Sequence, residues 1–313
     1  MVATFQAKTA IRATGLAMLS MLCLLAVILV VESYNSDRAK ASIAAHRAAH
    51  VVATQYDWMF EASAHALQRI EDSVVTKSSG KSPSEIRTLG NAVRDLPAGF
   101  SYSVFDAAGN LTHSSRPGPS SANIATEPYF RAARDGTELA LAPALASGDA
   151  PVNAFLMVRR LNASGPFTGI ATISIPATTL TTLAETLGLG DPSTIALVRA
   201  DGILLGRTPV VKPLSLAGWQ LFTELETASD GTFEAVSPAD GVERIIGYWH
   251  LPNWPVIALA GLDHTSALRP FWRNLLTSAI LALPILLGMG WLVLDLLHLL
   301  RVDEQRQIGR AHV

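Results

Sequence analysis

The chain has 313 residues, of which 49% are hydrophobic and 16% charged, and its mean hydropathy is +0.30. This is more apolar than an ordinary soluble domain, so membrane-embedded segments are expected. The net charge of -2 offers no basic face, which argues against nucleic acid as a partner. The single cysteine, Cys23, cannot form a disulfide within the chain, so a folded domain must be stabilised by its core alone.

The first apolar run predicts a transmembrane helix over residues 13–32, because roughly 20 apolar residues in a helix cross a bilayer core. Lys8 and Arg12 precede the run, which predicts that residues 1–12 are cytoplasmic. A cleaved signal peptide is the alternative, but its apolar region is normally about 7–15 residues long and ends in a small-x-small site. The longer run and the Val31-Glu32 junction favour an uncleaved anchor.

A second apolar run predicts a transmembrane helix over residues 275–296, after a juxtamembrane segment over 269–274. Charges flank it on both sides, so its direction follows from parity: the chain returns to the cytoplasm, where residues 297–313 begin a signalling helix. Asp295 and His298 lie near the inner end of this span. We expect both in the headgroup region, and a functional role inside the membrane is the alternative.

The last six residues, 308–313, are those that a widely used sequencing adapter encodes in this frame. We therefore expect them to be adapter-derived and the parent protein to continue beyond Gln307 into an output domain.

Residues 33–97 are expected to form a long extracytoplasmic helix and a linker. Ser36 to Val75 is rich in alanine and contains no glycine or proline, which favours one continuous helix. His46 and His50 are spaced to share a helix face, as two metal ligands would be. No carboxylate or cysteine motif completes such a site, so a packed or solvated helix face is favoured and no metal or other cofactor is predicted.

The region after the linker contains an internal duplication. Residues 104–111 and 197–204 share a strand-turn-strand pattern with Gly109 and Gly202 at the turns, where a positive φ is required. The stretch from Asp135 matches a later one from Asp230, and two further strands follow each (154–161 and 167–175, then 243–249 and 256–262). The pattern predicts an α+β fold in which an antiparallel sheet with helices on one face occurs twice, over residues 98–190 (the first unit) and 191–268 (the second unit).

The same region resembles the double Cache, or PDC, family of extracytoplasmic sensors. The resemblance covers about residues 39–273. It rests on Thr126 to Ala133, on Arg159 to Gly169 with its RRL and G-P-F-T-G pieces, and on Asp240 to Arg244. It implies a long N-terminal helix, two stacked PAS-like subdomains and a return through a second span into a signalling domain. The first unit would then be membrane-distal and the second membrane-proximal.

The resemblance also implies that a small-molecule ligand binds the first unit, with Tyr129 as the leading contact. The further candidates are Glu127, Phe130, Arg131, Met157 and Arg159. Many carboxylate-binding relatives have arginine two residues before this tyrosine, where Glu127 stands, so a simple dicarboxylate is disfavoured. Core packing is the alternative role for Tyr129 and Phe130, and a half-exposed strand position is the alternative for Arg159.

The expected function is reception of a small molecule outside the bacterial inner membrane and signalling across it. The favoured parent is a sensor histidine kinase, with a diguanylate cyclase or a chemoreceptor as alternatives and a membrane-anchored extracytoplasmic enzyme as the reading from another class. No catalytic motif is recognised. A homodimer through the N-terminal helix and the spans is expected. The larger and more polar cavity is expected in the first unit, because Trp219, Trp249 and Trp254 favour filled packing in the second.

Overall fold

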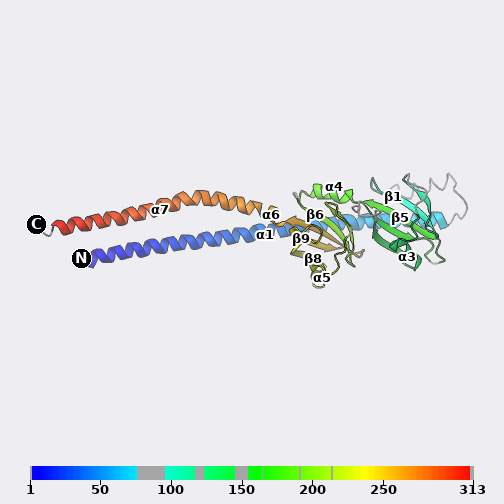
Figure 1. The fold of residues 1–313 in the computed structure, drawn as a ribbon, viewed down its shortest axis with the longest axis horizontal. Coiled ribbons are helices and arrows are strands. Elements are labelled where there is room, and N and C mark those ends of the chain that lie inside the picture. Colours follow the sequence, from blue (N-terminus) through cyan, green and yellow to red (C-terminus); the bar gives the residue numbers. More distant parts are fainter. Residues whose placement is uncertain are drawn as a thin grey trace. The chain divides into compact units, whose positions relative to one another are not determined.

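The computed structural model describes residues 2–75, 96–116, 123–144, 154–163, 165–189, 192–212 and 214–310. Its elements, of which Figure 1 labels several, are these in chain order: α1 (Val2–Val75), β1 (Ser101–Asp106), β2 (Leu111–Ser114), α3 (Pro128–Arg134), β3 (Leu139–Pro143), β4 (Ala154–Arg160), β5 (Gly169–Pro176), α4 (Thr178–Leu187), β6 (Thr194–Arg199), β7 (Leu204–Thr208), α5 (Gln220–Leu225), β8 (Asp230–Val236), β9 (Glu243–His250), β10 (Val256–Asp263), α6 (His264–Ala267) and α7 (Arg269–Arg310).

The predicted duplication is confirmed by two five-stranded antiparallel sheets of identical topology. The first has the order β2-β1-β5-β4-β3 and the second the order β7-β6-β10-β9-β8. Each begins with a hairpin whose glycine has a positive φ, 83° at Gly109 and 90° at Gly202. The carbonyl of each glycine also accepts an equivalent bond, from Ile124 N at 2.9 Å and from Leu216 N at 2.7 Å. The two units therefore share the same strand order, and their turns share equivalent backbone hydrogen bonds.

The match between Asp135 and Asp230 needs a correction. Asp135 lies in the turn after α3, whereas Asp230 is already the first residue of β8. The carbonyls of Glu138 and Ser229 accept equivalent bonds, from Arg160 N and His250 N at 2.8 Å each. The true counterpart of Asp230 is thus Leu139, and the shared Asp-Gly letters fall at different structural positions.

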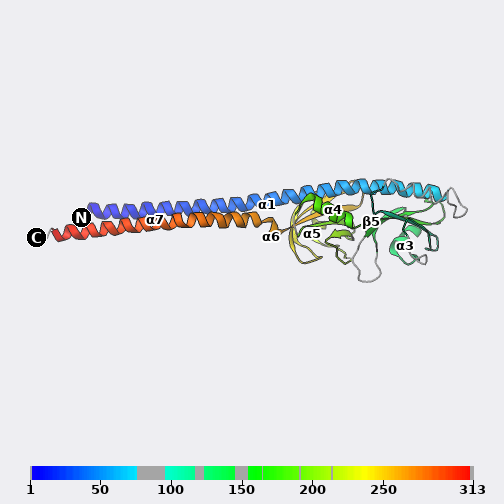
Figure 2. The same ribbon diagram turned by 90° about the horizontal axis from the view of Figure 1, so that it is seen from above.

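The part of α1 within residues 41–75 packs along one face of both sheets (Figure 2). A continuous core joins Tyr56 and Phe60 of the helix to Ile173 of the first sheet and Leu197 of the second. The opposite face of the first sheet packs against α3, and that of the second against α5. Each sheet therefore packs against α1 with one face, and its other face is covered by a short helix and loops.

Among the described residues, two helices are long and apolar enough to cross a membrane. The candidate spans fall within Ala13–Val74 of α1, at a mean hydropathy of 2.7, and within Arg269–Leu292 of α7, at 2.0. Pro284 lies inside α7 without ending it, as is tolerated in membrane helices. The chain thus has the elements of a membrane protein with a domain outside the membrane between its spans.

Candidate ligand-binding site

Strand alternation divides the predicted site residues between the two faces of the first sheet. Met157 is fully buried in the core that contains α1. Arg159 shares its face and donates from Nε to Oε2 of Glu71 on α1, at 2.6 Å. Both therefore lie on the face opposite to the one that packs against α3.

The four remaining candidates come together at α3. Phe130 is 1% exposed and packs edge-to-face on Phe167, with ring centroids 5.4 Å apart. Tyr129 is half-buried against the same cluster, and burial together with the charge of Glu127 raises the pKa of Tyr129 to about 12. Arg131 is exposed and donates to the carbonyl of Thr126 at 2.7 Å. Phe130 is thus core, and Tyr129 is a neutral phenol at the edge of that core.

The arginine on the α3 face is Arg160 rather than Arg159. Its Nη1 donates to the carbonyl of Ala133 at 2.9 Å, and its Nη2 to that of Gly165 at 3.1 Å. Its guanidinium carbon also lies 5.2 Å from the Phe167 ring centroid, a cation–π distance. Arg160 therefore holds α3 and the β4–β5 turn together.

Hydroxyl side chains line the α3-side face of the first sheet beyond this aromatic cluster. Ser103 pairs with Thr172 across β1 and β5, and Ser101 pairs with Ser174 one step along the same strands. Ser103 also pairs with Ser114 on β2, with 3.4 Å between the hydroxyl oxygens. We call these five residues the hydroxyl floor. It was not predicted from the sequence, although the Ser-Tyr-Ser and Thr-Ile-Ser alternations within apolar strands are its signal.

The second unit fills the equivalent face with larger apolar groups. The register places Ala196 and Leu259 where the first unit has Ser103 and Thr172, and Tyr248 where it has Val158. One step along, Phe233 stands in place of Ala142. Ala196, Leu259, Tyr248 and Phe233 are at most 7% exposed and form one cluster. The two copies thus share a backbone but differ in whether this face is packed or polar.

Comparisons with known proteins agree with this architecture. Residues 178–261 match the model of a family described as dCache_1_like, histidine kinase sensor domain. The extracellular domain of the candidate histidine kinase rpHK1S-Z16 is 24% identical, with a TM-score of 0.59 over 72% of this chain and 95% of that one. The periplasmic sensory domain of the Campylobacter jejuni chemoreceptor Tlp1 is 11% identical, with a TM-score of 0.54 over 75% and 99%.

A third structure with this architecture is the ligand-binding domain of PctB from Pseudomonas aeruginosa PAO1, which is 15% identical, with a TM-score of 0.51 over 72% and 92%. Residues 41–266 have the double Cache sensor fold. The predicted fold is confirmed, and residues 178–261 match a family of sensor domains. A search of curated proteins finds no significant match to the chain.

Two cavities lined by described residues lie in the second unit. One holds about 30 Å³ beside Trp219, and the other is an open hollow of about 460 Å³ lined by Phe222, Leu225 and His250. Residues 114–126 of the first unit fall partly outside the described residues. The larger first-unit cavity therefore stays a prediction, and the cavity beside Trp219 shows that this tryptophan does not fill its surroundings completely.

The histidine pair on α1 packs against the second sheet. His50 stacks on Trp249 with ring centroids 4.0 Å apart, and His46 lies 5.4 Å from the same ring. His46 Nε2 is also 2.9 Å from Oδ2 of Asp230. No group of three or more metal-ligating side chains occurs in the part of the chain that the structure describes. The packed helix face favoured from the sequence is therefore the observed arrangement.

Proposed function

We propose that the first unit of this double Cache domain receives a small polar ligand on the hydroxyl floor, beside Tyr129. The difference between the two copies carries the proposal. The same sheet face is packed by Leu259 and Tyr248 in the second unit, yet carries Ser103, Thr172 and Ser174 in the first. The hydroxyls of Thr172 and Ser103 make long bonds of 3.4 Å within the sheet, to the Ser103 carbonyl and the Ser114 hydroxyl, and a polar ligand would supply closer partners.

The charges around the floor favour a neutral or zwitterionic ligand. Arg160 is held by backbone carbonyls, Arg131 by the carbonyl of Thr126, and Arg159 is paired with Glu71 on the other face. Glu127 would repel a second carboxylate. Hydroxyls both donate and accept, so they suit a ligand with amide, amine and carboxyl groups. PctB, a structural neighbour, is described in complex with L-Gln, which makes amino acids the first compounds to test.

Signalling requires that ligand binding favours one of two packings of the domain. Strand β5, which carries Thr172 and Ser174, leads directly into α4 and the second unit. Arg199 of β6 also donates from Nη1 to the carbonyl of Leu141 on β3 at 2.5 Å. A shift of the first sheet is thus transmitted to the second, whose last strand continues by chain into α6 and α7.

We assign the chain to the input half of a sensor histidine kinase in the bacterial inner membrane, with the domain in the periplasm. The match of residues 178–261 to a histidine kinase sensor family supports this assignment. A chemoreceptor is the second candidate, because Tlp1 and PctB share the fold. A diguanylate cyclase and an anchored enzyme remain alternatives without a supporting observation of their own.

The proposed receptor is a homodimer through α1. Val51 and Trp58 are spaced by seven residues on the helix and are 43% and 55% exposed, and Ile43 is 51% exposed. An apolar stripe of this spacing is suited to pairing with a second helix. In a Cys23→Ser background, Trp58→Cys should cross-link two copies in membranes, whereas Cys at Thr227 on α5's side of the domain should not. Equal cross-linking at both sites would contradict this interface.

Binding is tested with the full chain in detergent micelles and the proteinogenic amino acids, L-glutamine first, by calorimetry. Thr172→Val removes a floor hydroxyl and keeps the side-chain shape, so affinity should fall about tenfold. Thr232→Val is the matched control, because it removes a strand hydroxyl of the second unit that bonds Ser42 at 2.7 Å. Equal affinities of a bound amino acid for both variants and the parent would move the site away from the floor.

A further inference from the structure

The first turns of α7 carry two arginines where the chain leaves the double Cache domain for its second span. Arg269 and Arg273 are four residues apart on the helix, and both are exposed. Between Asp263 and Asp295 they are the only Lys, Arg, Asp or Glu residues. Basic residues are normally concentrated at the cytoplasmic ends of spans, so a pair at the proposed periplasmic end calls for an explanation.

The charges of these arginines are not matched within the described part of the chain. Neither guanidinium group makes a hydrogen bond or an ion pair with another described residue. On α1, the carboxylate of Asp37 is paired with Lys40 at 2.8 Å. Glu32 is exposed and pairs with neither arginine. Both positive charges of α7 are therefore available to a partner outside the chain.

The two faces of α7 differ at this level. Phe271 is 5% exposed and packs edge-to-face on Tyr34 of α1, with ring centroids 5.4 Å apart. Trp272 is 60% exposed, and Leu276 one turn further is 64% exposed. Positions 269, 272, 273 and 276 have the i, i+3, i+4, i+7 spacing of a single helix face. The arginines therefore share an exposed face with a tryptophan and a leucine, while the opposite face of the helix packs on α1.

The height of this face matches the headgroup layer of a bilayer. A helix rises 1.5 Å per residue, so Arg273 and Arg269 lie about 3 Å and about 9 Å above the apolar run that begins at residue 275. The headgroup layer on each side of a bilayer is roughly 5–8 Å thick. Tryptophan is enriched in this layer, and arginine reaches it while its stem stays on apolar surface. Lipid phosphate is therefore the anion that these charges meet.

We propose that Arg269, Trp272 and Arg273 bind an anionic phospholipid, such as phosphatidylglycerol, in the periplasmic leaflet. Its phosphate lies at the two guanidinium groups and one acyl chain lies along Leu276. A zwitterionic lipid is disfavoured, because its own cation competes with the arginines for the phosphate. The site is independent of the ligand proposed for the first unit, and only its leaflet rests on the proposed topology.

A lipid bound here also reaches the contact between the two membrane helices. The rings of Trp272 and Phe271 lie edge-to-face with centroids 5.2 Å apart, and Phe271 in turn packs on Tyr34 of α1. Occupancy therefore holds the aromatic contact at which α7 meets α1.

The test uses the full chain in vesicles of phosphatidylcholine and phosphatidylglycerol, and measures tryptophan quenching by brominated acyl chains. Two samples have the same overall composition, with the bromine on phosphatidylglycerol in one and on an equal amount of phosphatidylcholine in the other. Subtraction of the Trp272→Phe variant isolates the signal of this tryptophan. Quenching by brominated phosphatidylglycerol should be several-fold the stronger. Equal quenching by the two lipids would overturn the proposal, and so would none by either, which would show that protein covers this face.

Two double variants assign the lipid preference to the arginine pair. Arg269→Gln with Arg273→Gln should reduce it at least about threefold, while quenching by brominated phosphatidylcholine persists and shows that the helix is still inserted. Arg47→Gln with Arg134→Gln removes the same charge from exposed positions of the domain and should leave the preference unchanged. A preference that survives the first double variant, or falls equally in both, would overturn the proposal.

A salt comparison separates a lipid headgroup from free phosphate. Sodium phosphate should lower the preference no more than sodium chloride of equal ionic strength, because both act by screening. A stronger effect of phosphate would assign the site to the free ion and overturn the lipid proposal.

Discussion

Arg159 and Glu71 form the ion pair that ties the first sheet to α1. The Nε–Oε2 distance is 2.6 Å, and the side chains are only 20% and 13% exposed. The other oxygen of Glu71, Oε1, accepts from Ala163 N at 3.3 Å. The carboxylate therefore joins β4 and the β4–β5 turn to the long helix.

Loss of this pair should destabilise the first unit. Glu71→Gln and Arg159→Met should each lower the free energy of unfolding, and the double variant should cost less than the two single changes added. We expect a coupling energy of about 1–2 kcal/mol, because the pair is shielded from solvent and hydrogen-bonded. Urea unfolding of the full chain measures it. Strict additivity would show that the two charges do not interact.

The same pair shows where sequence reasoning stops. The consecutive residues Arg159 and Arg160 place one cation on each face of the strand. The local sequence does not tell which of the two lies on the α3 face. The phase of β4 is set by Phe155 and Met157, which pack against α1. That contact spans almost a hundred residues of sequence and leaves no local signal. For the same reason, the hydroxyl floor emerges only when β1 and β5 are paired.

The fold itself was largely predictable, because its signals are local. The glycine of each hairpin, the unbroken alanine-rich helix and the apolar spans depend on neighbouring residues alone. The exception is the pairing of Asp135 with Asp230, where identical letters lie in a turn and in a strand. The segments before β3 and β8 differ in length, so the same Asp-Gly sequence falls in a turn in one unit and in a strand in the other.

Gly202→Ala should destabilise the second unit by about 2 kcal/mol or more. Its φ is 90°, and an added Cβ would lie 2.5 Å from Ala217 N. Both the left-handed backbone and the close approach oppose a side chain. Gly218→Ala is the matched control, because its φ is 79° but nothing lies within 4 Å of the added Cβ, so it should cost only about 1 kcal/mol. Denaturant unfolding with tryptophan fluorescence compares the two, and equal costs would contradict the role of the close contact.

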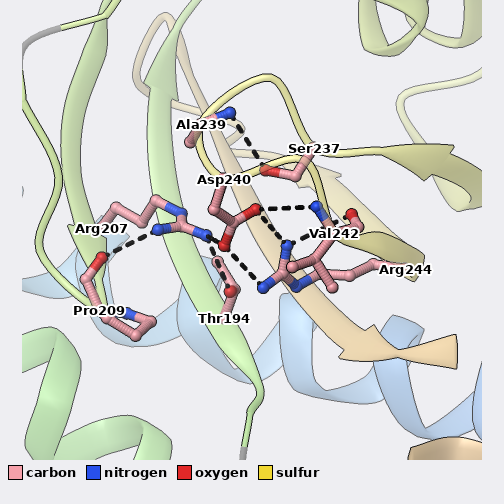
Figure 3. Close-up of polar contacts among 8 residues, drawn as sticks. All are labelled: Thr194, Arg207, Pro209, Ser237, Ala239, Asp240, Val242 and Arg244. Carbon is pink, nitrogen blue, oxygen red and sulfur yellow. Dashed lines mark hydrogen bonds and ion pairs between the residues drawn. The ribbon is translucent and has the colours of Figure 1, made fainter. Parts of the chain in front are cut away.

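Acid should weaken the second unit through Asp240. Burial acts to raise the pKa of this carboxyl, but the hydrogen bonds and charges of Arg244 and Arg207 outweigh it and hold the pKa well below its usual range (Figure 3). A depressed folded-state pKa contributes stability that is fully present above the unfolded value, about 3.9, and is lost as the pH falls towards the folded one. Unfolding free energies of the full chain should therefore decline below about pH 4. The Asp240→Asn variant should have a lower free energy of unfolding at neutral pH, and this free energy should decline less steeply with acid. Parallel pH curves for the two proteins would exclude Asp240 as the source of the acid sensitivity.

The two spans and the domain between them predict opposite accessibilities for two engineered cysteines. Cys23→Ser provides a background without thiols. Thr227, exposed in the second unit, lies between the spans, whereas Arg306 follows the second one. Because positive residues precede the first span, a membrane-impermeant maleimide added to cells with a permeabilised outer membrane should label Thr227→Cys at once. Arg306→Cys should be labelled only after the inner membrane is lysed. Labelling of Arg306→Cys in intact cells would place the two ends of the second span on the wrong sides, and protection of Thr227→Cys would remove the domain from the periplasm together with the sensing function proposed for it.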